Sequence, residues 1–353
     1  MPFTEYAKFP SIGPWIIKEY RDGEAATYER NPNYWNQPLP YADRAIIKWY
    51  GDPASKVAGL LSGDVNMIRV YGRQEIDQIQ KSGKDVSVLP FQFRAHGTHY
   101  INAERIPDKR VWKALHYLFD YQKANDSIYG KGLWDYSGPI NRALPGASPS
   151  EKIAQLPGWN PATKEADRKE AAALLRAAGF PDGEGLSIEM LMGSGSGTSF
   201  DIGVYHQADV KTIAPKAKFE LRPAPDPASY QRALAGREYQ MAGGYQIYEA
   251  LDPRLAAENW KSKASRNYAN YSNPQVDQLI DKSFAQPFKE AQGTIAEIEK
   301  LLLADLPLII PNGVFETMGA SNKIKGLADR LGPGSGGVYN EVHKARKFVW
   351  LEQ

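Results

Sequence analysis

The fold of this chain is decided by the stretch Met241-Ala-Gly-Gly-Tyr-Gln-Ile-Tyr-Glu-Ala-Leu-Asp-Pro-Arg254. It predicts a strand that follows a short polar helix and runs into a loop lined by glycine and aromatic residues. The loop turns at Asp252-Pro253, because a residue before proline is disfavoured in the helical region. Such a strand end is a common wall of a ligand cleft. An ordinary strand end whose tyrosines cover a core has the same pattern, so both interpretations stay open at this point.

The length and composition predict a soluble globular protein with two lobes. At 353 residues, the chain exceeds the size at which a single hydrophobic core stops growing. Apolar residues make up 42% and charged residues 24% of the sequence, which excludes an intrinsically disordered chain. The net charge is +2, and the sequence contains no long basic run, so we expect no nucleic-acid partner. No apolar run approaches the length of a membrane span.

Cysteine is absent from the sequence. This excludes disulfides, thiol nucleophiles and cysteine-ligated metals, and it is compatible with an oxidising compartment without requiring one. The first residues, Met1–Pro10, lack the basic start and apolar core of a secretory signal, so we expect that they are not one.

Strands alternating with helices predict an α/β lobe over about residues 97–311. Two strands, 86–90 and 99–102, are expected on either side of a turn at Gly97. A long loop follows at 131–156, and loops of this length in compact domains tend to be functional or mobile. The other expected elements are strands at 15–20, 25–30, 45–50, 65–70, 186–192, 219–222, 306–311 and 347–351, helices after the caps Asp52, Asp108, Asp226 and Asn273, and helices at 75–81, 167–178, about 200–213 and 290–304.

Two glycine-rich stretches resemble phosphate or nucleophile motifs in part. Gly332-Pro-Gly-Ser-Gly-Gly337 has the spacing of a dinucleotide fingerprint, but the chain ends before the acidic residue that the fingerprint needs. Gly193–Ser199 contains no Gly-x-Ser-x-Gly, so a nucleophile elbow is missing. As a strand-to-helix loop, Gly193–Ser199 offers backbone amides that can form an anion-binding nest.

Histidines and carboxylates give no catalytic or metal constellation. Only His96 and His99 are close in sequence, and a His-x-x-His pair in a turn without a nearby carboxylate is a weak metal signal. We expect the five histidines to be surface or hydrogen-bonding residues. Glu249 and Asp252 could be a carboxylate pair for glycoside chemistry, but both lie in one loop, whereas such pairs flank the substrate from different elements. Asp252 is better explained as a turn residue.

The order of several stretches resembles the extracytoplasmic solute-binding proteins of peptide and related ABC importers, the group that includes dipeptide- and oligopeptide-binding proteins. The resemblance covers nearly the whole chain. The matching stretches are Gly13-Pro-Trp-Ile-Ile-Lys-Glu-Tyr20, Glu29-Arg-Asn-Pro-Asn-Tyr-Trp35, Asp52-Pro-Ala-Ser-Lys-Val-Ala-Gly-Leu-Leu-Ser-Gly-Asp-Val65, Asn102, Asp108-Lys-Arg-Val111, Ala114-Leu-His-Tyr117 and Tyr268-Ala-Asn-Tyr-Ser-Asn-Pro-Gln-Val-Asp277.

The resemblance implies an α/β, two-lobe, periplasmic-binding-protein-like fold of the class II type. Residues 1–96 would form part of lobe I, 97–311 a complete lobe II, and 312–353 the return to lobe I. Family members carry a long stretch before the hairpin that begins at Gly13-Pro14, so we expect lobe I to be incomplete and its apolar surface exposed. The crossovers between the lobes would lie near Thr98–Asn102 and Ile309–Asn312. The predicted hinge residues are Thr98, Tyr100, Asn102, Pro311 and Asn312.

The resemblance also implies a ligand site on the stretch quoted first. The acidic residue that holds a ligand amine falls on Glu249, and the aromatic expected before it falls on Gln246, with Tyr245 adjacent. Tyr245 and Tyr248 would pack against the ligand. The further predicted ligand-binding residues are Ser194, Ser196 and Trp134. Dipeptide binders have an arginine in the loop equivalent to Gly193–Ser199, and no cation is present there, so a longer peptide or another ligand is favoured over a free dipeptide.

The predicted function is that of the substrate-binding component of an ABC importer. It would capture a peptide or related solute by hinge closure, without catalysis, cofactor or metal. The implied partners are the solute and an ABC permease of the inner membrane, and the implied state is a periplasmic or extracytoplasmic monomer. Two alternatives stay open. One is a truncated remnant that binds nothing, and the remote one is a hydrolase that uses the Gly193–Ser199 loop.

Overall fold

The chain forms two compact units. Unit 1 comprises Met1–Phe93 and Phe315–Gln353, and unit 2 comprises Arg94–Val314. The predicted lobe boundaries, after residues 96 and 311, lie within a few residues of these. The computed structural model describes residues 11–70, 72–193, 195, 197–247, 252–326 and 349–352.

Unit 2 is built on a mixed sheet. The last residues of β5 (Val86–Ile101) pair antiparallel with β9 (Met241–Ile247), which runs parallel to β7 (Ser187–Met192), and β7 runs parallel to β8 (Lys218–Pro223). Parallel strands covered on both faces read as continuous apolar runs. The end of β7 follows this rule, since residues 190–192 have no exposed surface. The predicted α/β lobe is therefore confirmed.

The predicted turn at Gly97 is wrong, because β5 is one continuous strand from Val86 to Ile101. The glycine serves a close approach instead. A Cβ atom at Gly97 would lie 2.8 Å from the Asn312 side-chain oxygen, closer than real Cβ contacts. The Gly97 amide also donates to that oxygen at 3.2 Å and to the Asn312 carbonyl at 3.0 Å.

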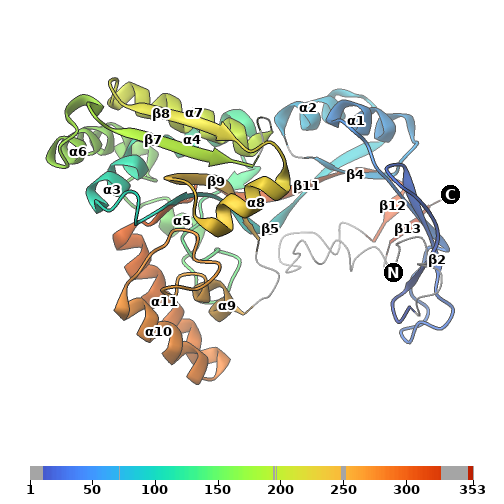
Figure 1. The fold of residues 1–353 in the computed structure, drawn as a ribbon. Helices are drawn as coiled ribbons and strands as arrows, with labels where there is room; N and C mark the ends of the chain where they lie inside the picture. Colours follow the sequence, from blue (N-terminus) through green and yellow to red (C-terminus); the bar gives the residue numbers. More distant parts are fainter. Residues whose placement is uncertain are drawn as a thin grey trace. The chain divides into compact units, whose positions relative to one another are not determined.

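Helices cover both faces of the unit 2 sheet. α7 (Thr198–Ile213) packs against β7, β8 and β9, and α8 (Pro227–Gly236) lies on the other side of β9 (Figure 1). The remaining elements of the unit are α3 (Lys109–Leu118), α4 (Tyr121–Ile128), β6 (Trp134–Asp135), α5 (Ser150–Ile153), α6 (Lys164–Ala177), α9 (Pro253–Glu258), α10 (Pro274–Ala285), α11 (Phe288–Asp305), β10 (Leu308–Ile309) and the first residues of β11 (Gly313–Ser321).

Aspartate caps begin several helices, as predicted. The tetrapeptide Asp-Pro-Ala-Ser occurs twice, before α1 (Pro53–Ser62) of unit 1 and before α8 of unit 2. Asp52 accepts from the Ser55 amide at 2.8 Å, and Asp226 accepts from the Ser229 amide at the same distance. Proline at the first helical position has the backbone angle that the helix requires. The same local sequence therefore forms the same cap in both units.

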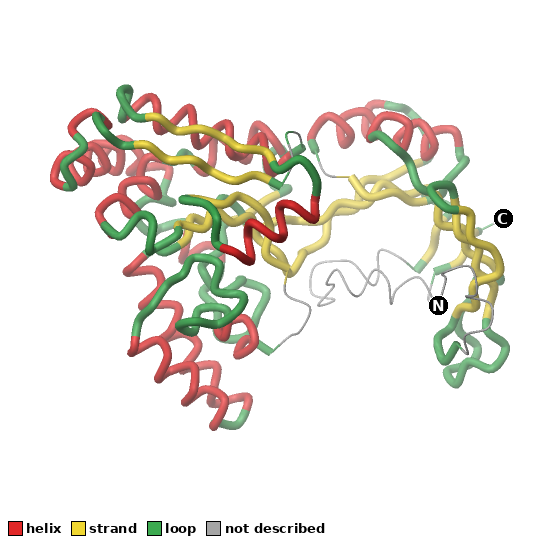
Figure 2. The backbone as a smooth tube through the Cα atoms, in the orientation of Figure 1, coloured by secondary structure: helices red, strands yellow, loops and turns green. Residues whose placement is uncertain are grey.

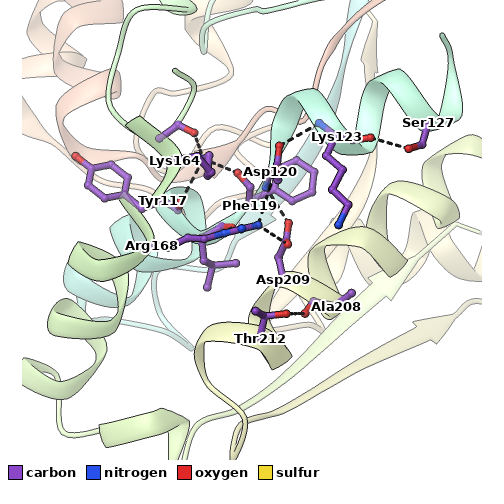
Figure 3. A network of polar contacts seen from close by, with 12 residues as sticks. Tyr117, Phe119, Asp120, Lys123, Ser127, Lys164, Arg168, Ala208, Asp209 and Thr212 are labelled. Atoms are coloured by element: carbon purple, nitrogen blue, oxygen red, sulfur yellow. Dashed lines mark hydrogen bonds and ion pairs between the residues drawn. The ribbon is translucent and has the colours of Figure 1, made fainter. Parts of the chain in front are cut away.

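A buried ammonium group joins α6 to the end of α3 (Figure 3). Lys164 donates to the carbonyls of Phe119 at 2.7 Å and Tyr117 at 3.2 Å, and also to the carbonyl of Gly158. Carbonyls at the end of a helix lack intrahelical partners, and Lys164 is the hydrogen-bond donor that replaces those partners. Burial lowers the pKa of Lys164 to about 8, while the three acceptors favour the charged form.

An ion pair extends this network to α7 (Figure 3). Arg168 of α6 donates to Asp209 at 2.9 Å, and Asp209 accepts from the Asp120 amide at 2.8 Å. Because Asp120 also caps α4 through the Lys123 amide, α4, α6 and α7 are fixed to one another by polar contacts as well as by the core.

The long segment 131–156 is packed into unit 2. Ile140, Leu144 and Ile153 are buried, and the amide of Ser148 donates to Glu299 of α11 at 2.7 Å. Burial raises the pKa of the Glu299 carboxyl. A long loop is expected to be functional or mobile, and this packing does not agree with a mobile segment.

Unit 1 contains a three-stranded antiparallel sheet in the order β1 (Trp15–Arg21), β2 (Ala25–Arg30), β3 (Arg44–Lys48). Residues 31–43 form the loop that joins β2 to β3 (Figure 2). The first three residues of β2 are buried, whereas no position of β1 or β3 is buried. Both outer strands of this sheet therefore keep partly exposed faces.

The rest of unit 1, in its described residues, consists of two helices and two strand pairs. Val57, Leu60 and Ile79 are buried between them. The elements are α1, α2 (Arg73–Lys81), β4 (Met67–Val70), which pairs antiparallel with the end of β11, and the pair formed by β12 (Ile324–Lys325) and β13 (Trp350–Leu351). No helix in the described ranges has the length and apolar character of a membrane span.

Candidate ligand-binding site

A cavity of about 240 Å³ opens at the carboxyl ends of the parallel strands of unit 2. Ligands of open α/β sheets bind at this edge, where loops leave the strands. The same edge of unit 2 contains Ala95, which pairs with Ile247 near the point where the chain crosses to unit 1. The cavity is lined by Met192 and Gly193 after β7, Ser199 and Phe200 of α7, Tyr230 and Gln231 of α8, and Gly243, Gly244 and Tyr245 of β9.

Gly244 of β9 allows α8 to approach the strand, whereas Gly243 leaves room for Met190 and Met192 of β7. The Tyr230 hydroxyl donates to the Gly243 carbonyl at 3.1 Å. A Cβ atom at Gly244 would lie 2.5 Å from that hydroxyl oxygen, so any larger residue there would force Tyr230 to shift. Burial raises the pKa of Tyr230 to about 12, and the phenol is neutral at physiological pH.

Tyr245 links the cavity to a cluster of hydroxyl groups. Its hydroxyl lies 2.8 Å from that of Tyr129 and 3.0 Å from that of Thr198, the first residue of α7. Burial raises the pKa of this hydroxyl well above its ordinary value, while the residue as a whole is 40% exposed. Tyr245 therefore has exposed surface beside the cavity, and two hydrogen bonds hold its hydroxyl.

A second, much smaller cavity of about 10 Å³ adjoins the first and shares Ser199, Gly244 and Tyr245 with it. It is also lined by Pro311 and Asn312. A space of this size holds one water molecule, so it gives no additional room for a ligand.

The predicted hinge residues all lie in unit 2, where they are firmly held. Asn312 donates to Asn125 at 2.7 Å, and Asn125 donates to the Pro311 carbonyl at 2.8 Å. Asn102 donates to the carbonyls of Arg237 and Tyr239. Thr98 and Tyr100, like Asn102 and Asn312, are buried. Their role in a hinge stays a prediction.

The structure brings together only part of the predicted ligand-binding set. Tyr245 lines the cavity. Gln246, the next residue, accepts from the Tyr100 hydroxyl at 3.2 Å, and Trp134 donates from its indole to Asp126 at 2.8 Å. Neither Gln246 nor Trp134 lines the cavity. The other predicted residues, Ser194, Ser196, Tyr248 and Glu249, lie outside the described residues.

Sequence reasoning missed most of the cavity wall. Ser199 is the last residue of the predicted nest and Phe200 follows it, and the position of that loop between a strand and a helix could have indicated both. Tyr230 and Gln231 gave no signal, because their helix reads as an ordinary polar one. The close approach at Gly244 depends on packing that the local sequence does not encode.

The lining contains no charged side chain among the residues that the structure describes. Asp201, on the first turn of α7, is the neighbouring acid, and partial burial raises its pKa. The four described histidines are buried and hydrogen-bonded, as in the contact of 3.0 Å between His99 and His206. Within the described ranges, no three histidine or carboxylate side chains are grouped so that they could hold a metal ion. The arrangement suits the binding of an uncharged group.

Comparisons with known proteins agree with this architecture. A binding protein of Brucella melitensis biotype 1 is 24% identical and covers 77% of this chain and 52% of its own length. The periplasmic oligopeptide-binding protein OppA of Haemophilus influenzae is 23% identical, covering 84% of this chain and 54% of its own. DppA from Helicobacter pylori, solved with the peptide STSA, has a TM-score of 0.76 and 17% identity, covering 97% of this chain and 63% of that one.

The chain thus spans about half the length of the curated relatives it matches. The structural similarity shows the periplasmic-binding-protein fold that the sequence predicted. The family model described as bacterial extracellular solute-binding proteins, family 5 Middle, matches residues 2–268, which is most of the chain. The chain belongs to the bacterial extracellular solute-binding proteins of family 5.

Proposed function

We propose that this chain is the substrate-binding component, or a large part of it, of an ABC importer that takes up a peptide or a related solute. The observation that supports it most is the cavity at the carboxyl ends of β7 and β9, in a chain of this family. The cavity is walled by aromatic rings and small residues and carries few polar groups, as small-ligand sites commonly are.

The proposed binding mode uses the cavity for the body of the ligand. The exposed surface of Tyr245 packs against the ligand, and Glu249, two residues beyond β9, pairs with a ligand amine. Charge-assisted hydrogen bonds strengthen as water leaves a closing cleft. Tyr248, Gln246, Ser194, Ser196 and Trp134 are proposed to add contacts, and Thr98, Tyr100, Asn102, Pro311 and Asn312 to hold the crossovers about which the lobes close.

The proposed setting follows from the family. The protein would work outside the cytoplasmic membrane, in the periplasm or on the cell surface, as a monomer that delivers its solute to an ABC permease. It would bind without catalysis, cofactor or metal. The peptide bound to the Helicobacter pylori relative supports the choice of peptides as the first ligands to test.

The experiment is isothermal titration calorimetry of the full chain with a panel of peptides of two to nine residues. We expect at least one peptide to bind, and Glu249→Gln to weaken a peptide with a free amino terminus by about tenfold or more, because a charge-assisted bond is lost. Glu220→Gln, at an exposed position of β8, is the matched control and leaves the affinity unchanged.

Two results would contradict the proposal at different levels. Equal affinity of the Glu249→Gln and unchanged proteins removes Glu249 from the site and leaves the function intact. Absence of binding across the panel and across a broad solute library, with no ligand raising the melting temperature, contradicts the function and favours a remnant that binds nothing.

A further inference from the structure

We propose that the cavity is a subsite for one uncharged, ring-sized side group of the ligand, and that Tyr230 is the residue that determines which groups fit. The inference rests on the proposed function, since it names the chemistry of a group that the same site receives. It is carried by three features of the cavity: its volume, its lining and the fixed position of one wall.

The volume fits a side group and is too small for a whole ligand. At about 240 Å³, the cavity exceeds the roughly 150 Å³ of an engineered apolar cavity that holds benzene. It falls short of the roughly 300–1,000 Å³ of pockets that enclose a complete small ligand. A phenyl ring or a branched aliphatic group fits, and the rest of the ligand must lie outside.

The lining favours an uncharged group. Phe200, Tyr230 and Tyr245 contribute apolar surface, and Gln231 is the polar side chain with the longest reach among the lining residues. A charged group placed here would lose its hydration without gaining an ion pair from the lining, which is strongly unfavourable. Lysine- or glutamate-like side groups are therefore disfavoured, and aromatic or aliphatic ones are preferred.

Tyr230 forms a wall whose position is fixed at both ends. Its backbone lies in the middle of α8, and its hydroxyl is bonded to the Gly243 carbonyl at 3.1 Å. The ring is in close contact with the bare backbone of Gly244, where an added methyl group would be 2.5 Å from the hydroxyl oxygen. A wall fixed in this way cannot move aside for a larger group, so it limits the size of the group that enters.

The test measures affinity for a series of tripeptides, Ala-Xaa-Ala, in which the middle residue is glycine, leucine, phenylalanine, tryptophan, glutamate or lysine. For the full chain we expect leucine and phenylalanine to bind about tenfold to a hundredfold more tightly than glycine, as burial of a large apolar side chain implies. Tryptophan should bind less tightly than phenylalanine, and the two charged residues no better than glycine.

Three variants test the Tyr230 ring separately from the contacts that hold it in place. Tyr230→Ala enlarges the cavity and should reverse the order of phenylalanine and tryptophan. Tyr230→Phe keeps the ring and loses only the hydrogen bond, so it should preserve the order. Gly244→Ala pushes against the ring and should bring phenylalanine and glycine to within about threefold of each other, because the contact is too close to be absorbed without a shift.

A second measurement separates failure of this inference from failure of the proposed function. The sequence has six methionines, and methyl NMR of the labelled chain reports on Met192 in the cavity wall, with Met318 of unit 1 as internal control. Indole and p-cresol serve as probes. If no tripeptide binds but the probes shift the Met192 signal and not that of Met318, the subsite stands, and the peptide panel with the solute library decides the proposed function.

The remaining outcomes also decide the matter. Tripeptides that bind with affinities within about twofold across the series overturn the subsite while the binding function stands. A preference that Tyr230→Ala leaves unchanged overturns the role of Tyr230. If neither tripeptides nor probes bind, the subsite is rejected, and the peptide panel with the solute library decides the proposed function.

Discussion

The two units of the chain differ in how completely they bury their apolar side chains. Unit 2 has one continuous core, in which Ile101, Leu115 and Ile298 have no exposed surface. Unit 1 is smaller, yet it contributes seven of the twelve large apolar side chains that are exposed among the described residues, Trp35 and Trp350 included. Since a rigid base is needed to hold a binding site in shape, this difference explains why the cavity is found on unit 2.

The largest expected effect comes from replacing one tryptophan in each unit by alanine. Trp112 is 2% exposed and Trp35 is 80% exposed. We expect Trp112→Ala to lower the free energy of unfolding by about 4 kcal/mol, because a large cavity opens in the core. Trp35→Ala should lower it by less than about 1 kcal/mol. Urea titration followed by circular dichroism measures both, and similar losses would abolish the contrast between the units.

Replacement of Lys164 tests how much its buried hydrogen bonds stabilise unit 2. Lys164→Met leaves three carbonyl groups without their donor, so we expect a loss of about 3 kcal/mol in the free energy of unfolding. Lys169→Met, on the exposed side of the same helix, is the matched control, with an expected change below about 0.5 kcal/mol. A change below about 1 kcal/mol for Lys164→Met would show that the buried ammonium is dispensable.

The pH dependence of stability should also belong to unit 2, which contains four of the five histidines. Burial lowers the pKa of His96 to about 3 and that of His206 to about 4. Because the unfolded chain binds these protons near pH 6.5, stability is fully present above that pH and falls as the pH drops towards 4. At pH 5 each of these two histidines contributes a loss of about 2 kcal/mol.

Carboxyl groups oppose part of this loss. Burial raises the pKa of Asp135 to about 6, so lowering the pH from 7 to 5 restores about 1 kcal/mol, and Glu299 acts in the same direction. His96, His206 and Asp135 together give a net loss of about 3 kcal/mol, and His99 and His116, whose pKa values burial also lowers, add to it. Urea titration at both pH values measures the loss. His206→Gln should remove most of the loss in the free energy of unfolding that one histidine contributes between pH 7 and pH 5. Equal stability of the unchanged chain at pH 7 and pH 5 would contradict the account.

The smallest expected effect is one that the two units should share. Asp52→Ala and Asp226→Ala remove the caps of the two Asp-Pro-Ala-Ser sequences, whose hydrogen bonds to the serine amides are both 2.8 Å long. Each change should lower the free energy of unfolding by about 1 kcal/mol. Losses that differ by more than about 1 kcal/mol would show that the surrounding unit, rather than the local sequence, determines the strength of a cap.

Local signals in the sequence were enough to place the caps and most strands. Asp108 and Asn273 cap α3 and α10 as predicted, because the residues that interact lie within one turn of each other. Asp252, predicted as a turn residue, accepts from the Arg254 amide and begins α9, a short helix that was not predicted. The strand 241–247 was predicted on the same local grounds.

The rest depended on partners far away in the sequence. Gly97 reads as a turn, but its contact is Asn312, which lies 215 residues later. Segment 131–156 reads as a loop because it is rich in glycine, proline and serine. Its packing nevertheless includes a contact with Glu299 of α11. Tyr230 was missed for the same reason, since its contact with Gly244 comes from the arrangement of α8 on β9. Order along the chain could nevertheless indicate the family.

If a ligand occupies the carboxyl ends of β7 and β9 in unit 2, it should slow hydrogen exchange of the amides there. The first amides of α7, at residues 198–200, have no intrahelical acceptor, and no side chain caps them. With the tightest-binding peptide of the panel, we predict exchange at these amides and at 230–231 to slow by about tenfold or more. Binding of a peptide without slower exchange at either place would contradict this position of the ligand.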